Sequence, residues 1–223
     1  MSVEHIRPSE IERASMVVIR RELERLGAVP PPENAPVVER VIHTTADFDY
    51  AENLVFTEGA AAAGVAALRA GTDVVTDTNM ARAGVSKTGL ARLGGQVFCY
   101  MAEPEIARAA REKGTTRAAA AAAYAAKENP RAIFAVGNAP TALLALEREL
   151  EAGLRPALIV AVPVGFVNVV EAKERILACC RRLEVPAIAA MGRKGGSNVA
   201  AAVCNALIYA AADMLDPAGR GWN

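Results

Sequence analysis

The sequence predicts an α/β protein: a flavodoxin-like, three-layer α/β/α arrangement with a five-stranded parallel sheet and additional N-terminal helices. Two observations lead to this prediction. From about residue 71 onward, short runs rich in β-branched residues alternate with helical stretches, which is typical of βαβ units with right-handed crossovers. Apolar residues make up 52% of the 223-residue chain and aromatic residues only 4%, so we expect a core of Ala, Val, Leu and Ile between helices and a buried parallel sheet.

The N-terminal part, about residues 9–70, is predicted to be helical. Ser9 and Glu12 form a capping box in front of a long amphipathic helix that ends at Gly27. A further helix is expected over residues 58–70. The expected inner stripe of the first helix is Ile11, Ala14, Ser15, Val18, Ile19, Leu23 and Leu26.

His43, one of two histidines in the chain, ends a predicted second helix. Asn34 is the expected N-cap of this helix, and Pro36 falls in its first turn, where a missing N–H costs little. The helix macrodipole favours a protonated ring at this end, which suits a general acid. The alternative is a solvated histidine that stabilises its helix end. At about 100° per residue, His43 lies roughly opposite the apolar face formed by Val37, Val38, Val41 and Ile42.

The α/β part, about residues 71–215, contains five predicted strands joined by helices. We expect the flavodoxin-like strand order 2-1-3-4-5, in a single domain that covers residues 1–223. The predicted helices cover residues 86–93, 104–127 (two helices broken at Gly114), 141–152 and 169–182. The predicted strands cover residues 73–76, 96–100, 132–136, 158–162 and 187–190.

Charge and hydropathy argue against two classes of partner. Lys and Arg together number 25, as do Asp and Glu, so the formal net charge is zero and no global nucleic-acid footprint is present. No apolar run approaches the roughly 20 residues of a membrane span, and residues 1–8 lack the apolar region of a signal peptide. We therefore expect a cytoplasmic protein without a nucleic-acid or membrane partner.

The cysteine and histidine content makes a metal centre improbable. The four cysteines form no CxxC pair, and only two histidines accompany them, so we expect no metal site. Each cysteine lies in an apolar context, which predicts reduced, buried thiols at Cys99, Cys179, Cys180 and Cys204.

Ligands of open parallel sheets bind beyond the carboxyl ends of the strands. Residues 192–198, after the last predicted strand, offer Arg193, Lys194 and Ser197 together with consecutive amides at a helix start, a combination that attracts anions. The GxxxxGK[ST] and GxGxxG spacings are absent. A basic surface turn is the alternative. The other loops of this edge would be residues 77–80, 101–104, 137–141 and 163–166.

Several single residues have two interpretations. Arg117 precedes a run of alanines and either clamps a carboxylate or is solvated. Ser15 is either bonded back to its own helix or directed into a pocket beside His43. The carboxylates that could orient His43 or bind a cation, or merely be solvated or capping, are Asp47, Asp49 and Asp77.

Six short motifs occur in order along the chain: residues 41–48 (VIHTTADF), 77–80 (DTNM), 116–117 (TR), 137–143 (GNAPTAL), 163–167 (PVGFV, followed by Glu171 and Lys173) and 192–197 (GRKGGS). Together they closely resemble the precorrin-8X methylmutase family of cobalamin biosynthesis, including its cobalt-precorrin-8 branch. The resemblance covers about residues 9–212, and the HTTADF form looks more like the cobalt branch.

The resemblance implies an isomerase, in which a methyl group migrates from C11 to C12 of the macrocycle as a 1,5-shift and gives the corrin ring. The family's catalytic histidine matches His43, which would protonate or hydrogen-bond ring C. No added cofactor is implied, since any cobalt arrives within the substrate. The resemblance also implies a homodimer with its site near the subunit interface, and hand-over of product to neighbouring pathway enzymes is conceivable.

The expected substrate is a flat apolar ring fringed with carboxylates, and the loop chemistry suits it. Met80, Val164 and Phe166 are expected against the ring. Arg117, Arg193, Lys194, Ser197 and loop amides are expected to hold carboxylates. The remaining expected substrate-binding residues are Ser15, Thr78, Asn79, Asn138, Thr141, Gly165, Gly195 and Gly196.

One segment departs from the family pattern, and two other functions compete. The chain has Ala14-Ser15-Met16 where the family is expected to have Arg-Ser-Phe, which removes one possible carboxylate contact. A tetrapyrrole-binding carrier without efficient catalysis is the first competing function. The second is a phosphoacceptor or nucleotide-binding module with Asp77 as its receiver carboxylate, for which a convincing acidic cluster is lacking.

Overall fold

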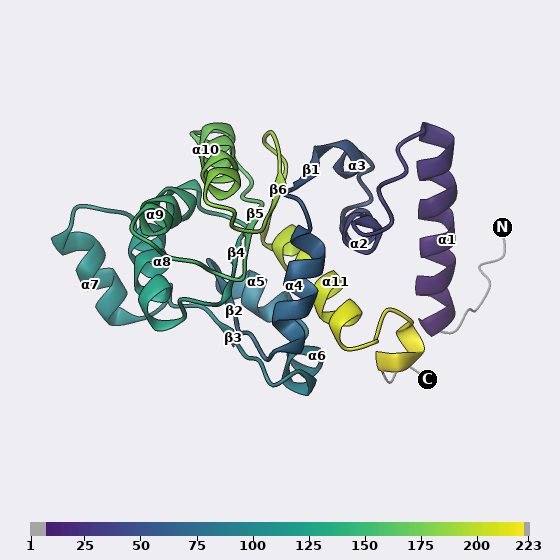
Figure 1. Ribbon diagram of the computed structural model, residues 1–223, viewed down its shortest axis with the longest axis horizontal. Helices are drawn as coiled ribbons and strands as arrows, with labels where there is room; N and C mark the ends of the chain where they lie inside the picture. The colour runs from purple at the N-terminus through teal and green to yellow at the C-terminus, as the bar shows by residue number, and fades with distance from the viewer. Residues whose placement is uncertain (1–7, 221–223) are drawn as a thin grey trace.

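The computed structural model describes residues 8–220, and its centre is a six-stranded sheet in the order β1-β6-β5-β4-β2-β3 (Figure 1). Residues 1–7, in which we found no signal region, lie outside the described part. The strands are β1 (Leu54–Phe56), β2 (Val74–Thr76), β3 (Val97–Phe98), β4 (Ile133–Val136), β5 (Leu158–Ala161) and β6 (Ala187–Ala190).

The five predicted strands are all present as β2 to β6, and they pair in parallel with one another. Counted along the chain from β2, they follow the predicted order 2-1-3-4-5. The prediction of a five-stranded, wholly parallel sheet is nevertheless wrong, because β1 adds an antiparallel edge strand beside β6. Three residues are too few to display the alternation by which a strand is read from sequence.

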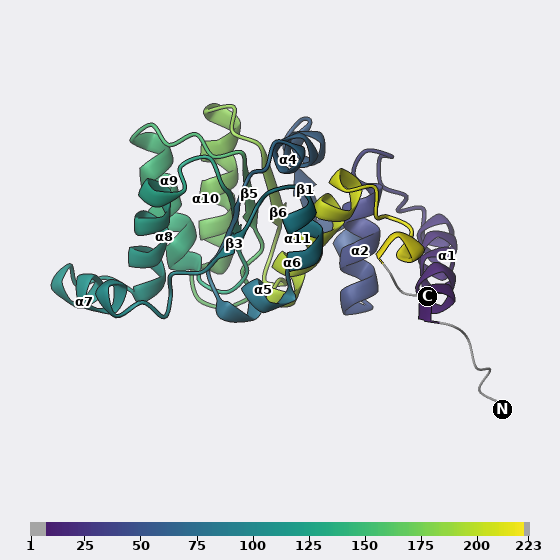
Figure 2. The same ribbon diagram turned by 90° about the horizontal axis from the view of Figure 1, so that it is seen from below.

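Helices cover both faces of the sheet, as predicted (Figure 1). One face carries α8, α9 and α10, and the other carries α4, α5, α6 and α11. Beyond α11 lie first α2 and then α1 (Figure 2). The helices are α1 (Pro8–Leu26), α2 (Ala35–Thr45), α3 (Tyr50–Asn53), α4 (Ala60–Arg69), α5 (Asn79–Gly84), α6 (Lys87–Arg92), α7 (Pro104–Glu112), α8 (Arg117–Glu128), α9 (Pro140–Glu151), α10 (Val169–Arg182), α11 (Ser197–Ala211) and the 3₁₀ helix η1 (Pro217–Arg220).

Strand residues alternate between two apolar layers. Ile133 and Ala135 of β4 pack with the α4/α11 layer, whereas Phe134 and Val136 pack with α8, α9 and α10. All four residues are buried, so the strand shows no polar face, as expected for a parallel sheet covered on both sides. All four cysteines are buried free thiols, as predicted. Within residues 8–220, no helix combines the length and the hydropathy that crossing a membrane would require.

The predicted buried faces are confirmed for α2 but only in part for α1. The apolar face of α2, from Val37 to Ile42, is buried as predicted, and it lies against α11. In α1 only Ile19 and Leu23 of the predicted stripe are buried. The prediction is wrong for Ile11, Ala14, Val18 and Leu26, which are exposed.

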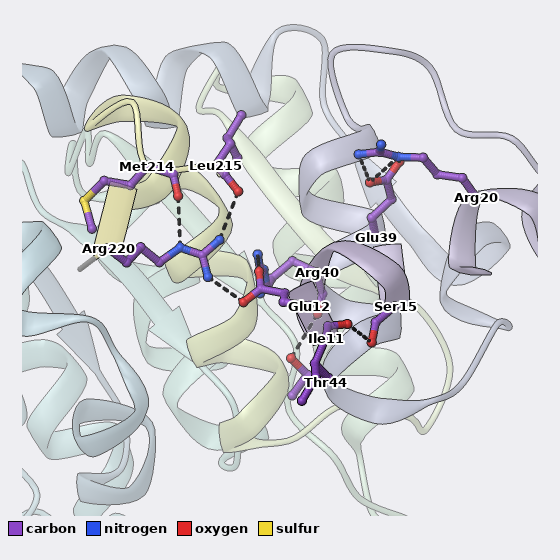
Figure 3. A network of polar contacts seen from close by, with 10 residues as sticks. All are labelled: Ile11, Glu12, Ser15, Arg20, Glu39, Arg40, Thr44, Met214, Leu215 and Arg220. Atoms are coloured by element: carbon purple, nitrogen blue, oxygen red, sulfur yellow. Dashed lines mark hydrogen bonds and ion pairs between the residues drawn. The ribbon is translucent and has the colours of Figure 1, made fainter. Parts of the chain in front are cut away.

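The inward face of α1 is displaced because it includes a buried carboxylate (Figure 3). Glu12 accepts hydrogen bonds from Arg40 of α2 at 2.6 Å and from Arg220 of η1 at 2.7 Å. The Arg220 guanidinium also lies 4.1 Å from the centre of the Tyr209 ring. The capping-box prediction is therefore wrong: α1 begins at Pro8, and the Glu12 side chain joins α1, α2 and the C-terminal segment.

Replacing Glu12 by Gln should destabilise the fold, because it leaves two buried arginines without their shared counter-charge. We expect the free energy of unfolding in urea at neutral pH to fall by about 3 kcal/mol. Burial would raise the pKa of Glu12, but hydrogen bonds from Arg220 and Arg40 outweigh burial and lower the pKa. Its contribution should therefore be present above the unfolded-state pKa and vanish as the pH falls through the lower folded-state pKa.

Glu22→Gln is the matched control, since Glu22 pairs with Arg25 on the outer face of the same helix. The urea midpoint of this variant should equal that of the wild type. Equal midpoints for Glu12→Gln and Glu22→Gln would show that the buried carboxylate does not hold the helices together.

Candidate active site

A buried carboxylate organises the loops at the carboxyl edge of the parallel strands. Asp77, directly after β2, accepts hydrogen bonds from the backbone amides of Gly137, Asn138 and Ala139, each at 2.8 Å. Burial raises the pKa of Asp77, while these three hydrogen bonds act in the opposite direction. The carboxylate shapes the loop after β4, and with 8% exposure it is poorly placed to accept a phosphoryl group.

Further hydrogen bonds connect the loops after β2, β5 and β6. The Thr78 and Ser197 hydroxyl oxygens lie 2.8 Å apart and join the loop after β2 to the start of α11. The Gly196 amide donates to the Val162 carbonyl at 2.9 Å, and the Gly165 amide donates to the Arg193 carbonyl at 3.3 Å. Four of the five predicted loops, those after β2, β4, β5 and β6, therefore hold one another in place.

Two glycines permit these close approaches. A Cβ on Gly137 would lie 2.7 Å from the Gly196 carbonyl oxygen and 2.8 Å from the Ser197 Cα. A Cβ on Gly195 would lie 2.2 Å from the Val162 carbonyl oxygen. All three distances are shorter than van der Waals contact, so the backbone segments can meet only where a side chain is absent.

The antiparallel strand β1 brings the segment after His43 to the same edge. Because β1 runs against β6, its first residue, Leu54, lies opposite Ala190, the last residue of β6. The chain that enters β1 must therefore pass beside the carboxyl end of β6. There the Lys194 ammonium contacts Asp47 at 2.6 Å and Asp49 at 2.5 Å.

The Lys194 ion pairs give both aspartates a partner in the loop after β6. The hydrogen bonds that the Lys194 ammonium donates to Asp47 and then to Asp49 raise the pKa of Lys194, and the bond from Lys194 lowers the pKa of Asp47. Both aspartates are thus paired rather than merely solvated. Lys194 is already engaged with protein carboxylates, which makes it a link between two segments of the chain.

A second lysine supports the same loop from below. Lys173 of α10 is 0% exposed, and its ammonium donates to the carbonyl oxygens of Gly192 at 2.9 Å and Lys194 at 2.8 Å. Desolvation by burial lowers its pKa to about 8. A lysine in a fully buried position is unusual unless its ammonium has polar partners, as it has here.

His43 is accessible at the end of α2, and its ring makes no hydrogen bond to another described residue. Partial burial of the ring lowers its pKa below the ordinary value, and the positive charge of Arg40 lowers it further; Glu12 acts in the opposite direction. The helix dipole alone had indicated a protonated ring. Desolvation of the ring, together with the positive charge of Arg40, opposes the helix dipole and lowers the pKa of His43 in the free chain.

The side chains expected against an apolar ring are exposed at this edge. Met80 is 73%, Val164 44% and Phe166 82% exposed. Met80 lies in the first turn of α5, and Val164 and Phe166 lie in the loop after β5. The Arg193 guanidinium lies 5.8 Å from the centre of the Phe166 ring, so one exposed cation and one exposed aromatic ring form a pair. Asn79 and Asn138 are exposed as well.

Arg117 and Thr141 lie at the adjoining starts of α8 and α9. The Thr116 and Thr141 hydroxyl oxygens are 2.8 Å apart, and Arg117, the first residue of α8, is exposed. Because Ala139 bonds to Asp77, these helix starts belong to the same edge as the other loops. Ser15 instead donates to the Ile11 carbonyl at 2.8 Å, the back-bonded alternative (Figure 3).

Sequence reasoning missed the structural roles of Lys173 and Asp77. A signal for Lys173 was available, because it shares the inward face of α10 with Ile176, Leu177 and Cys180, where a charge needs an explanation. No comparable signal distinguished Asp77 from an exposed loop aspartate, since its three partners are backbone amides about 60 residues away.

Comparison with known proteins gives one consistent result. A family model described as precorrin-8X methylmutase matches residues 10–210. The chain is 43% identical to a cobalt-precorrin-8 methylmutase of Salmonella typhimurium, with 91% of this chain and 95% of the relative covered. It is 39% identical to a precorrin-8X methylmutase of Pseudomonas aeruginosa, with 92% and 97% covered. A crystal structure of a precorrin-8X methylmutase from Thermus thermophilus superposes with a TM-score of 0.81 at 44% identity, covering 92% of this chain and 96% of that one.

The close approach at Gly137 can be tested by stability. Gly137→Ala should lower the free energy of unfolding by about 1–3 kcal/mol, because the added methyl group overlaps the Gly196–Ser197 backbone. Gly165→Ala, in a neighbouring loop, is the control, since the nearest atom to its Cβ is Val169 Cβ at 3.7 Å. Urea denaturation should separate the two variants, and equal stabilities would contradict the packing described for this edge.

Proposed function

This chain belongs to the precorrin-8X methylmutase family, and on that premise we propose that it moves a methyl group from C11 to C12 of precorrin-8, or of its cobalt form, to give the corrin ring. The protein is an intramolecular methyl transferase, an isomerase of cobalamin biosynthesis. The observation that supports the finer proposal most directly is the Lys194 pair with Asp47 and Asp49, because it joins the segment that carries His43 to the substrate loops.

The exposed edge suits a flat, apolar polycarboxylate. We infer that the ring lies against Met80, Val164 and Phe166, whose exposure would be removed by a ligand. Arg117 and Arg193 are exposed cations without an ion pair among the described residues, so they are free to bind substrate acetates and propionates. The remaining proposed contacts come from the Ser197 hydroxyl, the loop amides and the polar residues Thr78, Asn79, Asn138 and Thr141.

In the proposed mechanism His43 acts on ring C. Donation of a proton, or of a hydrogen bond, withdraws electrons from the ring while the C11–methyl bond breaks and the C12–methyl bond forms; the proton then returns to the imidazole, so the reaction is an isomerisation without net gain or loss. The lowered pKa disfavours the protonated ring in the free chain. Carboxylates of the bound substrate would raise that pKa and favour the acid form where it is needed.

We further propose that no added cofactor takes part, any cobalt being carried by the substrate, and that two copies of the chain form a homodimer. The apolar residues left exposed on and after α1 support a homodimer, because such rows are commonly covered by a partner. They are Ile11, Val17, Val18, Leu26 and Val29. Hand-over to neighbouring enzymes and a cytoplasmic location remain predictions from the sequence.

Substitution of His43 tests the function. Anaerobic mixing of the protein with precorrin-8X, and separately with its cobalt form, should produce the corrin absorbance spectrum over many turnovers. His43→Ala should lower kcat on the order of 10²- to 10⁴-fold, the usual contribution of a general acid. The glutamine of His43→Gln can donate a hydrogen bond but cannot transfer a proton to the substrate. This variant should be as slow as His43→Ala if proton transfer is required.

Two outcomes would contradict this proposal. Wild-type turnover by His43→Ala would remove the histidine from the mechanism. At most one equivalent of product from the unmodified protein on either ring would identify a carrier instead of an efficient enzyme. Relatives named for both forms of the substrate have similar identities, 43% and 39%, so both rings belong in the assay.

The pH dependence should show how the substrate changes His43. An acid must be protonated to act, so the rate should fall as the pH rises through its pKa. The value of kcat/KM reports the free enzyme. Because the pKa of His43 is lowered in the free chain, kcat/KM should begin to fall at a pH below the ordinary histidine pKa. The fall in kcat, which reports the substrate complex, should occur at higher pH. Coincident profiles would contradict the proposed effect of substrate carboxylates.

A further inference from the structure

Lys173 occupies a position that core packing alone does not explain. It is fully buried on the inward face of α10, beside Ile176, Leu177 and Cys180, where a leucine or methionine would fill the same space without desolvating a charge. The charged groups that face α10 from α9 are Glu147 and Glu151, and they pair with Arg175 and Arg182. Burial is the cause of the lowered pKa of Lys173, with no contribution from a charged side chain.

Its partners are two backbone carbonyls of one loop. The ammonium donates to Gly192 at 2.9 Å and to Lys194 at 2.8 Å, on both sides of Arg193. These bonds hold the main chain of Lys194 from below the loop, while its side chain extends to Asp47 and Asp49. Lys194 is therefore held at its backbone by α10 and binds the segment after α2 with its side chain.

The segment that Lys194 reaches has a defined shape of its own. The Asp49 amide donates to Asp47 Oδ1 at 3.1 Å, and the Asp47 amide donates to the Thr45 hydroxyl at 3.3 Å. Thr45 is the last residue of α2, two positions after His43. A displacement of Lys194 would thus be passed to the helix end through a short series of bonds.

We propose that Lys173 is a positioning residue: from beneath the β6–α11 loop it places Lys194 so that the Lys194 ammonium clamps Asp47 and Asp49 and thereby fixes the end of α2 that carries His43. The proposal deepens the proposed function and rests on it for the kinetic part of the test alone. The structural part needs no substrate, so failure of one can be told from failure of the other.

Hydrogen exchange tests the structural part. Lys173→Met keeps the stem of the side chain and removes both hydrogen bonds, so amides of residues 191–196 and 45–50 should exchange at least about tenfold faster, with the β4 and β5 amides unchanged. Lys127→Met, at an exposed position in the last turn of α8, controls for loss of a lysine charge and should match the wild type. Faster exchange in residues 191–196 alone would overturn the link to His43, and uniformly faster exchange would indicate a merely structural lysine.

Kinetics with the substrate test the positioning role. Lys173→Met should lower kcat on the order of 10- to 100-fold, the loss expected when a reacting group is displaced by about an ångström. Lys194→Met should lower kcat similarly, and the double variant should be no slower than the slower single variant, because both interrupt one series of contacts. Multiplied losses, or a rise in KM with kcat unchanged, would overturn the proposal.

If Lys173→Met does not fold, the second link can be tested alone. The double variant Asp47→Asn, Asp49→Asn leaves Lys173 and the loop intact and alters partly exposed side chains. It should lower kcat on the order of tenfold and speed exchange in residues 45–50 while residues 191–196 exchange as in the wild type. An unchanged kcat would overturn the proposal.

Discussion

The pairing of β1 with β6 is the constraint on which the candidate site depends. It is the one antiparallel pair in the described sheet, and its register sets Leu54 opposite Ala190. Antiparallel pairing places the start of β1 at the carboxyl edge, where the loops of the parallel strands gather. A parallel β1 would enter the sheet at the opposite edge, and the segment from His43 to Asp49 would then lie far from Lys194.

Buried charges of opposite sign make the irregular loops of that edge rigid. Loop amides require acceptors and loop carbonyls require donors when water is excluded. Asp77 supplies the acceptor for three amides of the loop after β4, and Lys173 supplies the donor for two carbonyls of the loop after β6. Glycines at 137 and 195 allow the backbone segments to approach closely enough for this arrangement. The side chains left exposed above these loops, including Met80 and Phe166, are then free to meet a ligand.

The electrostatic setting of His43 derives from the network that holds the N-terminal helices together. Arg40 and Arg220 share the carboxylate of Glu12, and all three side chains are largely buried. Together with desolvation of the ring, the arginines keep the pKa of His43 low. The same ion pairs that fasten α1 and η1 to α2 therefore influence the proposed acid, so stability and the proposed catalysis share residues in this part of the fold.

The sequence by itself determined the five parallel strands, their order and most helices and loops of the α/β part, because these features follow from local periodicity and from general rules of βαβ connection. It did not predict α5, whose first residues were expected in a loop. Tertiary structure decided the rest. The strand β1 is too short to show a pattern of alternation. The inward face of α1 is determined by the ion pairs of Glu12 with Arg40 and Arg220, which lie 28 and 208 positions away in the sequence. The partners of Asp77, Lys173 and Lys194 likewise come from distant segments, and a buried charge gives no sign in the sequence of which distant group will satisfy it.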